Sequence, residues 1–180
     1  IGPITTETAR ADLTIRPGHL EVEALDARAY KGAFTGTVGL TFGDPLELRT
    51  DLSGKGADLA RLIALAGKDL PLASAADVTF KIVGDPGKLA TWTGGGTFNA
   101  SPVPAGSSGR VPAGGRGRLT FASGQIKLTA DQLDMAAASL RFSFDAELSG
   151  APSKNRLTVD GTTRDARKTQ LATLSILDAF

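Results

Sequence analysis

The chain of 180 residues has room for one large domain or two small ones, and its hydrophobic fraction of 41% is sufficient for a packed core. Only 6% of the residues are aromatic, whereas the 22 glycines and 9 prolines favour short strands joined by turns. The formal net charge of +1 gives no basic excess for nucleic-acid binding, and the absence of cysteine excludes disulfides and thiolate chemistry.

Alternation of apolar and polar residues predicts strands with one apolar face along most of the chain. The clearest run is 34–42, in which bulky apolar residues and threonines point to opposite faces. The pattern continues, after a hairpin turn at 43–45, in the runs 46–52, 77–82, 92–98, 140–148 and 157–159. Because the strands keep a polar face, the sequence predicts an antiparallel meander and not a fully buried parallel sheet.

Two short amphipathic helices are predicted near 57–67 and 165–178, where leucines recur at helical spacing. Asp58 is the expected N-cap of the first helix. The segment 101–117 is rich in Pro, Gly and Ser and has no apolar periodicity, so it is predicted to be a flexible loop.

An internal repeat supports this order of elements. Leu13-Thr14-Ile15 aligns with Leu119-Thr120-Phe121, 106 residues later, and Gly18 aligns with Gly124 at the same offset. We therefore expect a first unit at 1–100, the loop at 101–117 and a second, truncated unit at 118–180. The missing initial Met and the end of the chain within the second unit predict a piece of a longer protein.

No constellation of catalytic or metal-binding residues is present in the sequence. The single histidine, His19, has no partner histidine or cysteine for a zinc site, and no G-x-S-x-G motif supplies a nucleophile for it. The glycine runs lack the Gly-Lys-Ser/Thr ending of a P-loop, and the aspartates do not follow a calcium-loop pattern. The sequence therefore predicts a non-catalytic protein without metal or cofactor.

The extended apolar face is the remaining candidate for function, either as a packed core or as an open groove. Many of its positions carry small residues, which would leave space for acyl chains in a groove but would also let two sheets approach closely. The small residues are Gly36, Gly94, Gly96, Ala100, Ala130 and Ala146. The residues alone favour the packed core.

Each unit follows the order strand, G-x-L/I strand, long alternating strand, strand and a helix that starts with Asp-Leu or Asp-Ala. The first unit contains LTIRPGHLEVEALDARAYKGAFTGTVGLTFGDPLELRTDLSGKGADLARLIAL. This pattern resembles the TamB/AsmA-like family, the translocation-and-assembly-module and bridge-like lipid-transfer proteins. The resemblance covers nearly all of the chain outside 101–117 and rests on a diffuse pattern with the DLARL step, not on a strict motif.

The resemblance implies a repetitive curved antiparallel sheet, a β-taco or open trough, with two short helices. It implies a periplasmic segment of a longer chain anchored at the inner membrane, which carries phospholipid for outer-membrane biogenesis. The implied partners are phospholipid acyl chains, flanking repeats of the same chain and an outer-membrane β-barrel assembly protein. The implied groove is lined by Phe34, Val38, Leu40, Phe42, Leu46, Leu48, Val78, Phe80, Ile82, Trp92, Phe98, Leu140, Phe142, Phe144 and Leu148.

Two other functions are kept as alternatives. A non-catalytic structural or interaction scaffold would have the same apolar face fully packed inside. A β-solenoid enzyme acting on carbohydrate would need clustered carboxylates on one face, and the sequence shows none.

Overall fold

The computed structural model describes residues 6–64, 71–104, 110–122, 124–135, 137–147 and 156–177. The strands, in chain order, are β1 (Thr6–Arg16), β2 (His19–Ala29), β3 (Gly32–Thr41), β4 (Glu47–Asp58), β5 (Leu72–Gly84), β6 (Thr93–Pro102), β7 (Val111–Ala122), β8 (Gln125–Met135), β9 (Ala138–Glu147) and β10 (Arg156–Thr163). The helices are α1 (Leu59–Ala64), the 3-10 turn η1 (Leu89–Thr91) and α2 (Ala166–Leu177).

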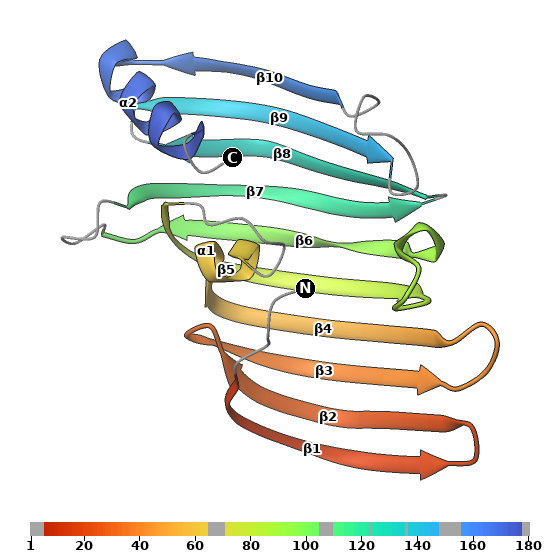
Figure 1. Ribbon diagram of the computed structural model, residues 1–180. Coiled ribbons are helices and arrows are strands. Elements are labelled where there is room, and N and C mark those ends of the chain that lie inside the picture. The colour runs from red at the N-terminus through yellow and green to blue at the C-terminus, as the bar shows by residue number, and fades with distance from the viewer. Residues whose placement is uncertain are drawn as a thin grey trace.

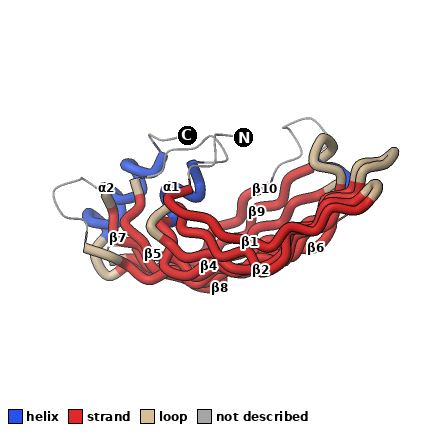
Figure 2. Tube along the Cα trace, turned by 90° about the horizontal axis from the view of Figure 1, so that it is seen from below, coloured by secondary structure: helices blue, strands red, loops and turns tan. Residues whose placement is uncertain are grey.

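The ten strands form one sheet in which each strand pairs antiparallel with its neighbours in the chain (Figure 1). Seen along the stack of strands, the sheet is bent into a trough, and α1 and α2 lie on its concave side near one end of the strands (Figure 2). A short parallel contact of Leu72 and Ala73 with Val111 and Pro112 links β5 to β7 at that end. The prediction of a mainly β, curved antiparallel sheet with two short helices is therefore confirmed.

β-bulges account for the bend of the strands. The register shifts in β2 beside Ala24, in β4 beside Gly56 and in β8 between Ala130 and Leu133. At the β4 bulge Gly56 has a φ of +66° and its N–H donates to Asp77 Oδ1 at 2.9 Å. Because an extra residue on one strand bends it and increases its twist, these bulges contribute to the curvature of the sheet.

The strand bounds repeat at the offset found in the sequence. β2 and β8 both span 11 residues, and β3 and β9 both span 10 residues, each pair displaced by 106. The glycines before β2 and β8, Gly18 and Gly124, have φ values of +75° and +73°. The counterpart of β1 is β7, which begins at Val111, so the second unit starts earlier than the predicted residue 118.

The predicted loop at 101–117 is wrong over most of its described length. β6 continues to Pro102, and β7 already begins at Val111. The glycines that suggested a loop are required by strand packing: a Cβ on Gly117 would lie 2.5 Å from Phe98 Cε1, and one on Gly114 would lie 2.8 Å from Pro102 Cδ. Glycine here permits close approach of side chains from the neighbouring strand.

The predicted helix at 57–67 was placed too early, because Ala57 and Asp58 still belong to β4. Asp58 caps α1 as predicted, since the Arg61 N–H donates to its Oδ1 at 3.4 Å. Residues 65–67 lie outside the described residues. For the helix predicted at 165–178, Asp165 is the residue before α2 and accepts a hydrogen bond from the Lys168 N–H at 3.1 Å, and residue 178 is not described.

Three cations surround the Asp58 carboxylate, whose side chain is 8% exposed. Its Oδ2 lies 3.2 Å from Arg110 Nη1, 3.7 Å from Lys31 Nζ and 3.9 Å from Arg61 Nε. The carboxylate thus connects the β2–β3 turn, the start of α1 and the residue before β7.

We expect Asp58→Ala to lower the free energy of unfolding by about 2 kcal/mol, because it removes a helix cap and a shielded ion-pair centre together. Asp165→Ala is the matched control at the equivalent position of the second unit. This variant removes a cap whose side chain is 41% exposed, and we expect the free energy of unfolding to fall by about 1 kcal/mol or less. Urea denaturation of both variants measures the difference, and equal losses would contradict the role assigned to the three cations.

Candidate functional site

The register of the sheet places the bulky apolar residues on the concave face. Side chains of directly paired residues in neighbouring strands lie on the same face of a sheet. Starting from Phe34 in β3, the pairing runs across β4 to β10 through Gly54, Val78, Phe98, Gly117, Ala130, Phe142 and Val159. The helix residues Leu59 and Leu62 pack against this row, which identifies the face as the concave one.

Most of the predicted groove residues belong to this face. The pairings of β3, β4, β5, β6 and β9 bring the following residues to this face: Phe34, Val38, Leu40, Leu48, Val78, Phe80, Ile82, Phe98, Leu140, Phe142 and Phe144. Phe42 follows β3 and is 55% exposed, and Leu46 precedes β4 and is half-buried. Leu148 lies outside the described residues.

Trp92 joins the face at the start of β6. Its ring meets that of Phe121 edge-on, with centroids 5.5 Å apart, and its Nε1 donates to the Asp85 carbonyl at 2.8 Å. The hydrogen bond satisfies the polar group of a ring that is otherwise in apolar contact. Trp92 therefore closes one end of the apolar face as a fixed structural element.

The predicted set omitted further residues of the same face. They are Leu13 and Ile15 in β1, Leu20 and Val22 in β2, Leu52 in β4, Leu119 and Phe121 in β7, Ile126, Leu128 and Leu133 in β8, and Val159 in β10. The alternation in 13–15, 119–121 and 126–128 is a signal that could have found several of them, because each segment repeats the apolar–polar–apolar pattern.

Glycines on the face do not leave the free space that their size suggested. A Cβ on Gly54 would lie 2.5 Å from Phe34 Cε1, and a Cβ on Gly96 would lie 2.8 Å from Phe80 Cδ1. Aromatic side chains from the neighbouring strands therefore already cover these glycines. Of the small residues considered in the sequence, Gly96 therefore leaves no free space for an acyl chain.

The bulky residues of the face are incompletely shielded. Among the described residues the buried apolar core consists largely of alanines, and no large side chain is fully buried. The described strands form one sheet, and no second sheet lies against it in the part of the chain that the structure describes.

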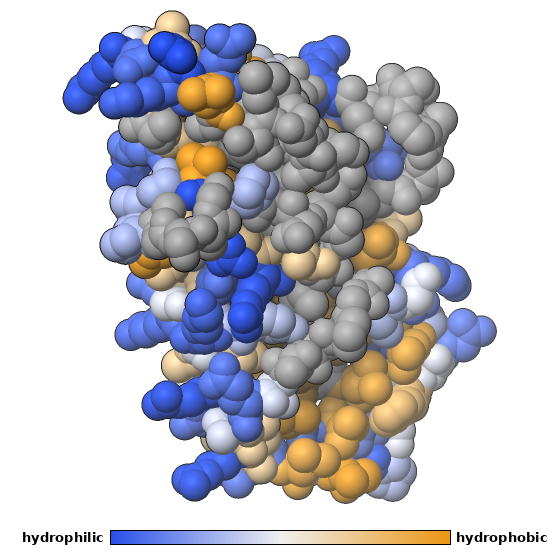
Figure 3. Space-filling model, turned by 60° about the vertical axis from the view of Figure 1, so that its left-hand side comes forward, coloured by the Kyte–Doolittle hydropathy of each residue, from blue (hydrophilic) through white to orange (hydrophobic). Residues whose placement is uncertain are grey.

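In the first strands, the exposed part of the face lies at the end of the strands away from α1, while Val159 in β10 is 55% exposed as well. Ile15, Leu13 and Phe42 are 75%, 60% and 55% exposed. Figure 3 shows the corresponding apolar surface in orange at its lower right, at the height of the first strands. Towards the other end, Leu59 and Leu62 of α1 pack over Phe34, Phe80 and Phe98. The concave face therefore combines a packed part with an open part.

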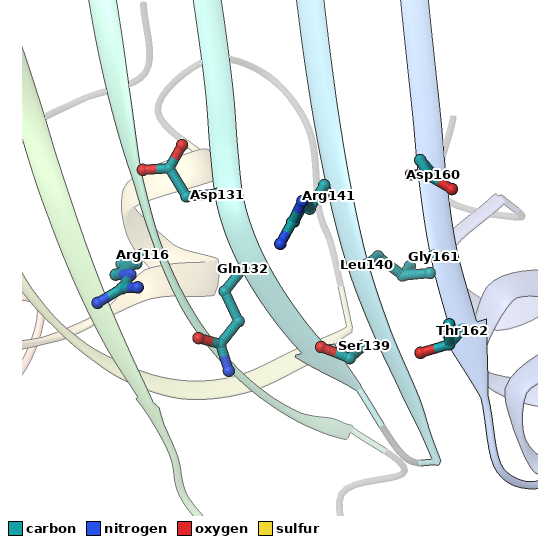
Figure 4. Close-up of a pocket in the computed structure, with 9 residues that line it drawn as sticks. All are labelled: Arg116, Asp131, Gln132, Ser139, Leu140, Arg141, Asp160, Gly161 and Thr162. Carbon is teal, nitrogen blue, oxygen red and sulfur yellow. The ribbon is translucent and has the colours of Figure 1, made fainter.

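The opposite, convex face carries a polar hollow in the second unit (Figure 4). Its side chains come from β7 to β10, where Arg141 pairs with Asp160 and Ser139 with Thr162. These residues alternate with Leu140 and Gly161, whose positions belong to the concave face. The lining includes the carboxylates of Asp131 and Asp160 and the guanidinium groups of Arg116 and Arg141, and the hollow is an exposed polar surface.

His19 is exposed at the start of β2, and its Nδ1 lies 3.2 Å from Thr41 Oγ1. Within the described ranges, no three His, Asp or Glu side chains gather closely enough to hold a metal ion. No helix in the described part of the chain is both long and apolar enough to cross a lipid bilayer.

No family model, curated protein or solved structure matches this chain. The concave apolar face is accordingly the candidate site on its geometry alone.

Proposed function

We propose that the concave face carries the acyl chains of phospholipids along the trough. The observation that supports this function is the distribution of burial: alanines form most of the core, while most bulky apolar residues of the face are only partly buried and Leu13, Ile15 and Phe42 are more than half exposed. Large exposed apolar surfaces on soluble proteins are typical of sites that bind an apolar partner.

The mechanism is passive and needs no covalent step. Acyl chains lie against side chains such as Phe42, Val38 and Phe142, while the head groups stay in water at the open side of the trough. Each buried CH₂ contributes roughly 0.8 kcal/mol. Because apolar residues recur on all strands, this contribution changes little from one position to the next, and a lipid slides without crossing a high barrier.

The resemblance of the sequence to the TamB/AsmA-like proteins extends this proposal to a cellular setting. In that setting the chain is a periplasmic segment of a longer, inner-membrane-anchored protein and works in outer-membrane biogenesis. Flanking repeats would continue the trough, and an outer-membrane β-barrel assembly protein would be a partner.

A non-catalytic scaffold is the second candidate function. Two observations favour the scaffold, because they make part of the face a conventional core. Leu59 and Leu62 of α1 pack on Phe34, Phe80 and Phe98. Aromatic rings also cover Gly54 and Gly96. This function predicts that the protein binds no lipid.

Lipid extraction followed by mass spectrometry, on protein purified without detergent, distinguishes the two functions. We expect phospholipid to copurify in at least equimolar amount and to exchange for added phospholipid. A folded protein that is free of lipid, and that takes up none from vesicles, would exclude the transport function and leave the scaffold.

A further inference from the structure

The hollow on the convex face holds four charged side chains, one on each of its strands, that are not engaged with one another. They are Arg116 in β7, Asp131 in β8, Arg141 in β9 and Asp160 in β10. No side-chain hydrogen bond or ion pair joins any of them to another described residue. Elsewhere on this face such pairs are closed, since Lys81 Nζ lies 3.1 Å from Asp51 Oδ2 and Lys127 Nζ lies 3.5 Å from Asp145 Oδ1. The hollow therefore keeps charges of both signs available to a ligand.

A β-bulge in β8 accounts for this open arrangement. Asp131 and Gln132 together lie opposite the single residue Arg141 of β9, and both line the hollow. An extra residue bends the strand and changes the direction of its side chains, so the regular cross-strand pairing is interrupted. Figure 4 shows Gln132 between Arg116 and Arg141, with Asp160 beyond Arg141 on the next strand.

The charges of β9 and β10 have no counterpart in the first unit. Thr35 is equivalent to Arg141 at the offset of 106, and it pairs with Ser53 as Arg141 pairs with Asp160. The same part of the sheet thus forms in the first unit with two neutral hydroxyl side chains. Because folding of the repeat does not require an arginine and an aspartate here, these residues point to a ligand.

We propose that the hollow binds a short extended peptide with free ends. An arginine binds a carboxylate through paired hydrogen bonds, and the Gln132 amide supplies a further donor. The carboxylate of the peptide therefore lies over β8, between Arg116 and Arg141. Its ammonium group lies at Asp160 in β10, and Asp131 disfavours ligands that carry a second negative charge.

The spacing of the strands selects the length of this peptide. From β8 to β10 there are two strand spacings, or about 9.6 Å. An extended chain of three residues spans about 10 Å, so a tripeptide reaches both charged ends. This inference goes beyond the proposed function and is independent of it, because the hollow lies on the face opposite the trough.

The test uses the full chain, isotope-labelled for NMR, and triglycine as the probe. We expect saturable chemical-shift changes confined to β7–β10, which weaken as salt is added. N-acetyl-triglycine lacks the ammonium group and triglycinamide lacks the carboxylate, so each should bind at least tenfold more weakly. These comparisons vary only the ligand and do not depend on the folding of a variant protein.

Three variants assign the contacts. Arg141→Gln should weaken the binding of triglycine at least tenfold, and the fold should persist because this side chain is exposed. Arg118→Gln is the matched control, since Arg118 is exposed on the same face of β7 but does not line the hollow, and it should bind like the wild type. Asp160→Asn should abolish the preference for triglycine over its N-acetyl form, which a purely structural role would leave unchanged.

Several outcomes would overturn the proposal. These are the absence of saturable shifts, equal binding of triglycine and its capped forms, and wild-type binding by Arg141→Gln. Glycerophosphoethanolamine represents a lipid head group, whose two charges are separated only by an ethylene bridge. Binding of this compound in place of triglycine would also overturn the peptide assignment.

Discussion

Replacing Phe142 by Asp is expected to reduce the bound phospholipid at least tenfold while the sheet stays folded. Phe142 lies on the concave face between Ala130 and Val159, is only partly buried, and is not among the residues of the packed clusters. A carboxylate there keeps its hydration in the empty trough but would lose it beneath an acyl chain. Such desolvation costs well over the 1.4 kcal/mol that corresponds to a tenfold change.

The matched control is Thr158→Asp, which introduces the same charge on the adjacent strand. Thr158 pairs with Ser143 on the convex face and is exposed, so this variant should retain lipid like the wild type. Mass spectrometry of extracted lipid and thermal unfolding by circular dichroism are measured on both variants. If Phe142→Asp unfolds the protein, the face is a packed core and the scaffold function holds. If it stays folded and still carries lipid, the acyl chains lie elsewhere.

The glycines of β6 should be among the least replaceable residues of the chain. We expect Gly95→Ala to lower the free energy of unfolding by about 3 kcal/mol, because the added Cβ would overlap backbone atoms of β7 that cannot rotate away. The two strands would have to separate or change their register, and the contact between Trp92 and Phe121 would then be lost.

Gly39→Ala provides the control, since it makes the same change in a strand with space available. A Cβ on Gly39 would have its nearest neighbour, Arg49 Cβ, at 3.9 Å. Alanine also restricts the unfolded chain, so this variant should be unchanged or more stable by up to about 1 kcal/mol. Urea denaturation measures both free energies. Similar values for the two variants would show that β6 and β7 are less closely paired than the structure indicates.

The sequence allowed the strands and their faces to be predicted wherever alternation was regular. The run 34–42 is the clearest example, because each apolar residue on it faces the trough and each threonine faces outward. The repeat also predicted the order of strands and helices, and Asp58 the cap of α1.

The prediction of strands and loops failed where a glycine is required by close contact with a neighbouring strand and not by a turn. Gly114 and Gly117 looked like loop residues, yet they lie in β7 beneath Pro102 and Phe98 of the neighbouring strand. No local pattern reveals which ring will cover a glycine, because this depends on the register between strands. For the same reason, the sequence could not show that the small residues of the candidate site are already covered.

The width of the sheet has a consequence for the number of lipids in the trough. Ten strands separated by nine spacings of about 4.8 Å give a trough roughly 43 Å long. The tails of one bilayer leaflet extend only about 15 Å, half of the hydrocarbon thickness. Under the proposed function, a trough of this length would hold several molecules in single file and would not be a pocket for one. A lipid entering at one end would then advance the whole file without any residue changing its conformation.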